Sequence, residues 1–269
     1  MAPRDLKELA REKFRTPDFC TGSMDIIGRY ADDIPRVNAT ILDAVRPERP
    51  DARICELGFG TGWLLEEMRD AFPEASICGL DLSEALVAQV REDGLPRVDL
   101  LLGDMERLPF ADASFDVVAT CWTLYFLRDI DAAFDGIVAT LRPGGKLVAA
   151  TVAPDHMIEF HEAAMESFRI GVPKHDREDH SVRFDLDSGA PYMRRHLRDV
   201  EVREWHGALR LPDVATALRL WEVQYGRERS GEPFQAARDE MERLLSDWHE
   251  REGTLEVRRH GGLFVGRRA

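Results

Sequence analysis

The sequence lacks long apolar runs, and this absence narrows the classes of protein to which it can belong. Among its 269 residues, no stretch approaches the roughly 20 consecutive apolar residues that a membrane-spanning helix needs. Residues 1–15 are charged throughout and lack the apolar segment of a secretory signal. We therefore expect a cytoplasmic protein with no membrane partner.

Cysteine is also scarce, and its positions do not suggest a cross-linked or metal-bound scaffold. The four cysteines show no Cys-x-x-Cys or Cys/His spacing of the kind that binds zinc. Cys55, Cys78 and Cys121 fall in apolar runs with strand character, so they are expected to be small buried side chains. The sequence therefore predicts neither a disulfide framework nor a metal site.

Positive charge is in deficit, because the formal net charge is -14. A nucleic-acid backbone would be repelled on average, so we expect no nucleic-acid partner. The basic residues near the chain end are interpreted as solvated charge beside a last strand, and they are Arg258, Arg259, Arg267 and Arg268. Hydrophobic residues make up 44% of the chain and charged residues 32%, the ordinary balance of a globular domain with a substantial core.

The middle of the chain alternates short apolar runs with helical patterns. This alternation predicts βαβ units and hence an α/β fold with a doubly wound, mostly parallel sheet covered by helices on both faces. Strands are predicted at residues 53–57, 75–80, 97–102, 115–120 and 146–152. Helices are predicted at residues 61–71, 83–92 and 130–141.

The flanks have a different pattern, in which helices dominate. Helical periodicity is found at residues 37–45, 155–170, 213–225 and 234–250, and strands are predicted at 200–205 and 263–266. Residues 174–187 are polar and charge-dense, which is typical of a loop or a cover. We expect one domain over residues 1–269, with an N-terminal helical cover (1–48), a cofactor-binding core (49–153) and a substrate lid with the last strands (154–269).

The most informative segment is Ile-Cys-Glu-Leu-Gly-Phe-Gly-Thr-Gly, residues 54–62, where a strand ends in a glycine-rich turn before a helix. Glycines at such a turn adopt backbone conformations closed to other residues, and the new helix offers free N–H groups to an anion. Dinucleotide-binding proteins favour G-x-G-x-x-G, but Trp63 stands where the third glycine would be. The pattern is instead G-x-G-x-G, with Glu56 two residues before the first glycine, and a glycine turn that binds no ligand is the alternative.

Acidic residues end the next two predicted strands. Asp81 can accept hydrogen bonds from both ribose hydroxyls of a nucleoside, a role equally suited to NAD, and Asp104 follows the third strand. Further along are Ser-Phe-Asp-Val-Val at 114–118 and Leu-Arg-Pro-Gly-Gly-Lys-Leu at 141–147. In this order and spacing, the motifs resemble those of the type 11/25 domain of class I S-adenosylmethionine (SAM)-dependent methyltransferases over about 100 residues.

The resemblance implies a Rossmann-like, seven-stranded sheet in the order 3-2-1-4-5-7-6, with the last strand antiparallel and helical lid additions. It also implies SAM as the cofactor. The methionine part of SAM would lie against the acidic residue and the glycines of the first turn, with the ribose on Asp81 and the adenine between the residues after the third strand. The cofactor-binding residues so implied are Glu56, Gly58, Gly60, Gly62, Asp81, Leu82, Asp104, Met105, Cys121, Trp122 and Tyr30, the last of which is equally well interpreted as a core tyrosine.

Residues for the acceptor side are less well defined. His156 and His161 follow the fifth strand on the expected substrate edge, and Tyr125 follows the fourth, so these three are the candidates for a catalytic base. Packing or surface roles are the alternative for each histidine, and their i, i+5 spacing does not suit metal binding. We expect methyl transfer to oxygen or nitrogen of a small or medium organic molecule, such as a secondary metabolite or a peptide. The alternatives are a non-methylating SAM-binding or scaffold protein and a nicotinamide-dependent oxidoreductase.

Overall fold

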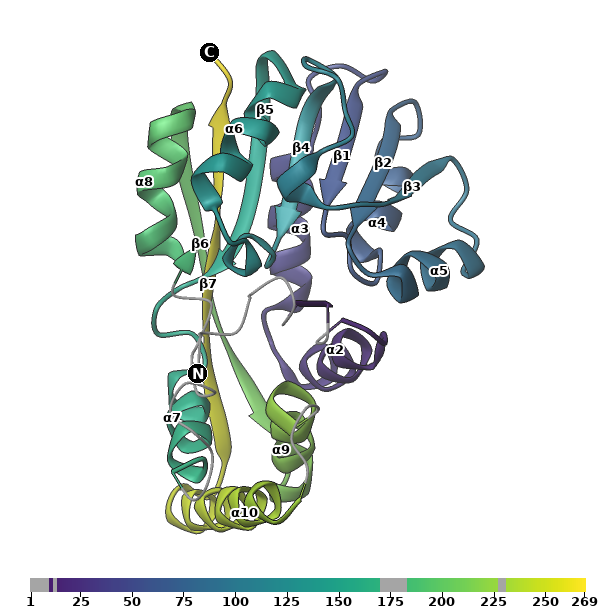
Figure 1. Cartoon of the computed structure of the whole chain (residues 1–269). Coiled ribbons are helices and arrows are strands. Elements are labelled where there is room, and N and C mark those ends of the chain that lie inside the picture. Colours follow the sequence, from purple (N-terminus) through teal and green to yellow (C-terminus); the bar gives the residue numbers. More distant parts are fainter. Residues whose placement is uncertain (1–9, 12–13, 170–182, 227–230) are drawn as a thin grey trace.

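A computed structural model of the chain contains one seven-stranded sheet (Figure 1). The structure describes residues 10–11, 14–169, 183–226 and 231–269. The strand order is β3-β2-β1-β4-β5-β7-β6, and β7 runs antiparallel to both of its neighbours. This confirms the predicted topology. The strands are β1 (Arg53–Leu57), β2 (Ser76–Asp81), β3 (Val98–Leu102), β4 (Phe115–Cys121), β5 (Leu141–Val152), β6 (Arg198–Leu211) and β7 (Leu255–Arg267).

Helices cover both faces of the sheet, as expected for a parallel core that is apolar on both sides. One face is covered by α3 (Ile34–Val45), α4 (Trp63–Ala71) and α5 (Glu84–Glu92), whose buried residues form one cluster with the strands. The opposite face carries α6 (Ile130–Thr140) and α8 (Leu186–His196), which share a second apolar cluster. The parallel strands all end at the same edge of the sheet, where the turns after β1, β2 and β4 meet.

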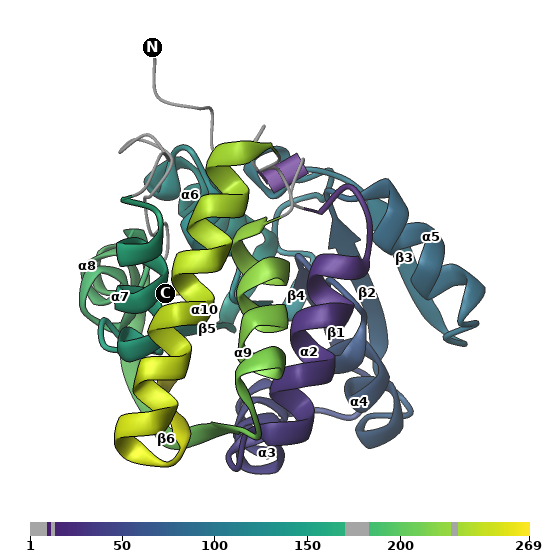
Figure 2. The same ribbon diagram turned by 90° about the horizontal axis from the view of Figure 1, so that it is seen from below.

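A third apolar cluster lies beyond that edge, around the ends of β6 and β7 that extend past the rest of the sheet. Four helices pack there, side by side in Figure 2. We call these helices and strand ends the helical extension. Its helices are α2 (Asp18–Tyr30), α7 (Ile158–Ser167), α9 (Val214–Trp221), which continues into a π-helical turn at Glu222–Gly226, and α10 (Glu232–Glu252).

The last two strands are much longer than the sequence predicted. Residues 255–261 alternate in burial as a strand should, but two arginines and the glycines at 261 and 262 conceal the apolar pattern. One of those arginines, Arg259, is not solvated as predicted: it is 6% exposed, and its Nε donates to Asp33 Oδ1 at 2.7 Å. Arg258, Arg267 and Arg268 also donate to carboxylate or carbonyl oxygens, so the basic chain end is engaged within the fold.

Helix α8 was missed in the sequence. Residues 174–187 were predicted as a polar loop or cover; of these, 174–182 lie outside the described residues, and α8 begins at Leu186. An Asp185–Ser188 capping box starts the helix, and Pro191 inside it masks the helical pattern. Among the described residues, no helix is both long enough and apolar enough to span a bilayer.

Candidate active site

The glycine-rich turn leaves the carboxyl end of β1 and enters α4. Gly58, Gly60 and Gly62 all have positive φ, at 73°, 55° and 81°. A Cβ at Gly58 would lie 2.6 Å from the Thr123 side chain, so the position requires glycine for space as well as for conformation. A Cβ at Gly60 would meet nothing within 4 Å. The turn is thus packed against the protein at Gly58 and open at Gly60, where a ligand can lie along the backbone.

Asp81 connects this turn to the end of β2. Its Oδ2 accepts from the Gly60 N–H at 2.9 Å, and its Oδ1 accepts from the Ser83 N–H at 2.8 Å. Burial raises the pKa of Asp81, and the backbone hydrogen bonds partly oppose that shift. An ionised carboxylate has about four acceptor positions, so two remain for the hydroxyls of a ligand.

Glu56 is the second buried carboxylate of the site. It is 1% exposed, and its Oε2 has no hydrogen-bond partner. Burial raises the pKa of Glu56 well above its usual range, and the nearby charge of Asp81 adds to the shift. A buried carboxylate oxygen without a partner is costly, so this arrangement fits a ligand that brings a cationic or N–H donor group.

The turn after β3 supplies a smaller set of groups. Asp104 caps the short 3-10 helix Met105–Arg107, and its side chain accepts from the Glu106 N–H at 3.0 Å. Met105 is buried and packs in the same cluster as Leu80, whereas Leu82 is half-buried beside Asp81. These side chains give one polar and two apolar surfaces next to the end of β2, a combination that suits a flat heteroaromatic ring.

The end of β4 borders the same space. Cys121 is 8% exposed, and burial raises its pKa well above the usual range, with a further contribution from Glu56. The thiol is therefore a protonated, packed group. Trp122 has a φ of 53°, which is strained for a bulky residue, and its ring centroid lies 6.4 Å from that of Trp63. Strain of this kind is concentrated at functional sites.

The remaining predicted residues have separate sets of neighbours. Tyr30, at the end of α2, is half-buried against the helical extension. Tyr125 packs in the cluster below α6, with its ring 4.8 Å from that of Phe126. His156 Nδ1 lies 2.7 Å from the backbone oxygen of His260 on β7, and His161 Nδ1 lies 3.3 Å from the hydroxyl of Tyr225.

One contact at the site was not predicted from the sequence. The Ser83 hydroxyl donates to the backbone oxygen of Phe14 at 2.6 Å, and the ring of Phe14 stands edge-on to Phe126 at 5.4 Å between centroids. The segment before α2 therefore lies against the turns after β2 and β4. In the sequence, Ser83 is only the first residue of the helix predicted at 83–92, and nothing around Phe14 indicates this long-range contact.

Comparison with known proteins identifies the middle of the chain. Residues 55–149 match the family model described as a methyltransferase domain. This segment is a class I methyltransferase domain. SAM is the methyl donor of the family. The Glu56 oxygen without a partner fits its amino group, and the open backbone at Gly60 fits its methionine chain. The remaining acceptor positions of Asp81 fit its ribose hydroxyls.

Curated relatives align with only part of the chain. The chain is 41% identical over 64 residues to malonyl-[acyl-carrier protein] O-methyltransferase of Xylella fastidiosa (strain M23), an alignment that covers 24% of this chain and 22% of that protein. It is 28% identical over 135 residues to phthiotriol/phenolphthiotriol dimycocerosates methyltransferase 1 of Mycobacterium ulcerans (strain Agy99), covering 50% and 48% of the two chains. The chain thus spans between about a fifth and a half of the length of these relatives.

Solved structures share the fold over most of the chain. A putative methyltransferase from Bacillus halodurans is 14% identical, with a TM-score of 0.59 over 86% of this chain and 98% of that one. The [4+2]-cyclase SpnF is 19% identical, with a TM-score of 0.51 over 87% and 80% of the two chains. At such low identity, these similarities establish the methyltransferase fold and nothing finer.

Proposed function

We propose that the whole chain is a SAM-dependent methyltransferase that transfers a methyl group to oxygen or nitrogen of a small or medium organic molecule. The observation that carries this proposal is the Glu56 carboxylate, buried at the end of β1 with Oε2 unpartnered beside the open glycine turn. Such a group has a clear purpose if it receives the amino group of the methionine part of SAM.

The proposed cofactor site uses the residues predicted from the sequence. Glu56 holds the amino group, and the backbone of Gly58, Gly60 and Gly62 lies along the methionine chain. Asp81 accepts from the ribose hydroxyls while keeping its own bonds to the Gly60 and Ser83 N–H groups. The adenine ring is placed against Leu82, Asp104 and Met105. These groups follow β1, β2 and β3, so they meet at the carboxyl edge of the sheet, where ligands of such folds bind.

Methyl transfer from SAM requires the protein mainly to position the acceptor. Bound SAM supplies an activated methyl group on its sulfonium, so the protein has to hold an acceptor atom in line and exclude water. Cys121 and Trp122 are proposed to line the transfer cleft, and Tyr30 to cover the methionine end. A neutral amine acceptor needs no base, whereas a phenol or alcohol does. His156, His161 and Tyr125 are the proposed bases for the latter case.

A division of labour within one domain follows from this assignment. Residues 49–153 are proposed to bind the cofactor, and residues 1–48 and 154–269 to cover and select the acceptor. In support, α2 from the first segment and α7, α9 and α10 from the last share a single apolar cluster, the helical extension. The names of the relatives support an organic acceptor, because they include malonyl-[acyl-carrier protein], demethylmenaquinone and phthiotriol methyltransferases.

One alternative keeps the cofactor but not the reaction. The [4+2]-cyclase SpnF has a similar fold and a different reaction, so the fold does not by itself decide the chemistry. A nicotinamide-dependent oxidoreductase is less well supported, because Trp63 stands in place of the third glycine and Glu56 precedes the turn.

The deciding assay supplies SAM with three separate pools of acceptors: phenols, carboxylic acids with thioesters, and amines. It measures both S-adenosylhomocysteine and a product one methyl group heavier than its acceptor. We expect one pool to give both products with wild type and neither with Asp81→Ala. If folded wild type binds S-adenosylhomocysteine but no pool gives product above the acceptor-free background, the non-methylating alternative is favoured instead.

A further inference from the structure

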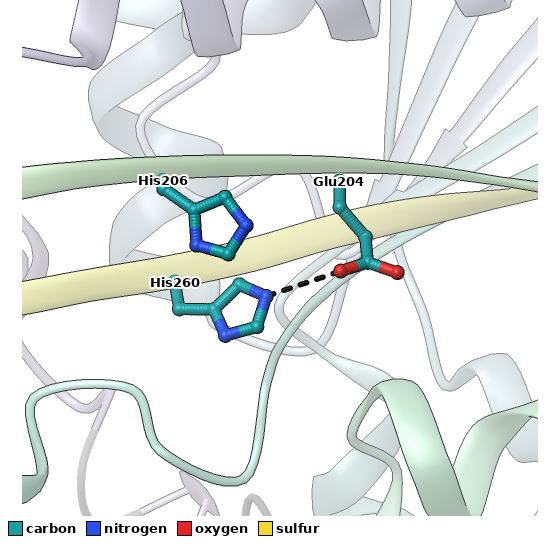
Figure 3. A group of neighbouring side chains, drawn as sticks. All are labelled: Glu204, His206 and His260. Carbon is teal, nitrogen blue, oxygen red and sulfur yellow. Dashed lines mark hydrogen bonds and ion pairs between the residues drawn. The ribbon is translucent and has the colours of Figure 1, made fainter.

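Three potential metal ligands lie together on β6 and β7, outside the proposed cofactor site. Glu204, His206 and His260 each offer one ligand atom, and these atoms all lie within 4.8 Å of one another (Figure 3). We propose that this cluster is a binding site for a divalent transition-metal ion, with Zn²⁺ as its preferred occupant.

The strand register explains why these residues meet. Glu204 and His206 are two residues apart on β6, so their side chains emerge from the same face of the sheet. His260 is the direct partner of His206 across the antiparallel pair. Paired positions bring Cβ atoms within about 5 Å, and the two imidazole centroids lie 4.1 Å apart. Three ligands are therefore supplied by a rigid two-stranded platform rather than by loops.

His260 is held in an orientation that suits coordination. Its Nδ1 lies 2.5 Å from Asp155 Oδ1, and its Nε2 points at Glu204 Oε2, 3.2 Å away. Asp155 is itself fixed, because its Oδ2 accepts from the Arg258 side chain at 3.0 Å. A carboxylate on the far nitrogen of a metal-binding histidine sets the tautomer and leaves the other nitrogen free for the metal. A cation would occupy the gap that the Nε2–Glu204 hydrogen bond spans.

The donor set indicates the class of metal. Two imidazoles and one carboxylate are the ligands of open zinc sites, in which water takes the fourth position, whereas Mg²⁺ and Ca²⁺ prefer oxygen ligands throughout. Tetrahedral zinc needs donor atoms roughly 3.4 Å apart, and the ligand atoms here lie within 4.8 Å of one another. Glu204 and His206 are exposed and free to turn inward, whereas His260 is more enclosed and gives the fixed point.

No motif in the sequence predicts this site. The nearest histidine to His206 in the sequence is 10 residues before it, His196, and His260 lies 54 residues beyond, so no short motif joins the ligands. Only the long β6–β7 pair, itself under-predicted, brings them together. The site lies next to the carboxyl end of β5, since Gly261, which follows His260, pairs with Val152, the last residue of β5. The proposal does not depend on the proposed methyl transfer.

The test is calorimetric titration of tag-free, chelator-treated protein with ZnCl₂, supported by the visible absorption of bound Co²⁺. We expect one ion per chain for wild type. His206→Ala and Glu204→Gln should abolish stoichiometric binding, and Asp155→Asn should weaken it about 10- to 100-fold, as loss of an orienting carboxylate does. The matched control is Glu201→Gln, an exposed glutamate on the same strand outside the cluster, which should bind Zn²⁺ as wild type does.

Thermal unfolding of each variant without metal shows whether it is folded. Addition of Zn²⁺ should raise the midpoint of wild type and Glu201→Gln, raise that of Asp155→Asn less, and leave those of His206→Ala and Glu204→Gln unchanged. Failure of folded wild type to bind one equivalent would overturn the proposal. So would equal Zn²⁺ affinity in wild type, His206→Ala and Glu204→Gln, because the ion would then be held elsewhere on the chain.

Discussion

The carboxyl edge of β1 to β4 and the helical extension differ in the sequence separation of the residues that contact one another. At the edge, Glu56, Gly60 and Asp81 lie within 26 residues of one another, and Gly60 bonds directly to Asp81. In the extension, α2 packs with helices that follow it by almost 200 residues, and Arg259 of β7 pairs with Asp33 across 226 residues. The first region is defined by short motifs, whereas the second is defined by tertiary packing.

The two regions also treat buried charge differently. Asp33 is buried and its Oδ2 also lacks a hydrogen-bond partner, but its Oδ1 accepts from the Arg259 guanidinium, so the charge of the carboxylate is compensated within the fold. Glu56 is just as buried, and its Oε2 has no partner. Ionising a buried carboxyl group that has no compensating charge costs stability. The comparison indicates a structural role for the Asp33–Arg259 pair and a ligand-binding role for Glu56.

The largest expected effect on stability is in the helical extension. Trp221 is fully buried and stacks on Phe234 at 5.3 Å between ring centroids. Trp221→Ala should lower the free energy of unfolding by about 3–5 kcal/mol, measured by urea denaturation. Trp221→Phe is the control and should lose less than about 1.5 kcal/mol, because Nε1 has no hydrogen-bond partner to lose. Equal losses in the two variants would contradict the account of this core.

A matched pair of glycines compares the two regions directly. Gly58, at the edge, and Gly253, which ends α10, have nearly the same φ, 73° and 71°. Alanine at Gly253 should cost about 1–2 kcal/mol, from conformation alone. Alanine at Gly58 should cost about 3 kcal/mol, because Thr123 must also move and lose its bond to the Cys121 oxygen. Urea denaturation measures both, and a smaller loss at Gly58 than at Gly253 would be inconsistent with the packed turn.

The smallest effect, a difference in pH dependence, concerns Glu56. Its pKa is raised in the folded protein, so stability is fully present below the pKa of the unfolded chain and declines as pH rises through the raised value. Glu56→Gln removes this decline. In the ligand-free state, the variant should therefore gain stability relative to wild type with increasing pH, measured as the difference in thermal midpoint. A difference that stays constant with pH would show that Glu56 does not titrate in this way.

Much of the fold was predictable because its elements are signalled locally. The first four strands were placed within a residue or so, since they are continuous apolar runs bounded by turn residues. The last two strands were predicted too short. On β7, Arg259 interrupts the apolar pattern because it is a charged residue, and it is buried through its ion pair with Asp33. Helix α8 was not predicted, because Pro191 and the charged residues before the helix conceal its pattern. Its Asp185–Ser188 capping box is nevertheless present in the sequence.

The candidate site divides in the same way. The groups proposed to bind the cofactor follow successive strands, so the sheet topology brings them to one edge. The candidate bases have no such constraint: His156 lies against β7, and His161 lies near Tyr225 of the helical extension. Their surroundings depend on strand lengths and helix packing that the sequence pattern did not predict.

The central claim is that the glycine turn, Glu56 and Asp81 form a SAM site, and titration with S-adenosylhomocysteine tests it most directly. Wild type should bind it and ignore NADH, and Asp81→Ala should weaken binding at least about a hundredfold through loss of charged hydrogen bonds. Asp213→Ala, which removes a helix-capping carboxylate in the helical extension, should bind as wild type does. Folded wild type that fails to bind, or equal binding by Asp81→Ala, would contradict the account.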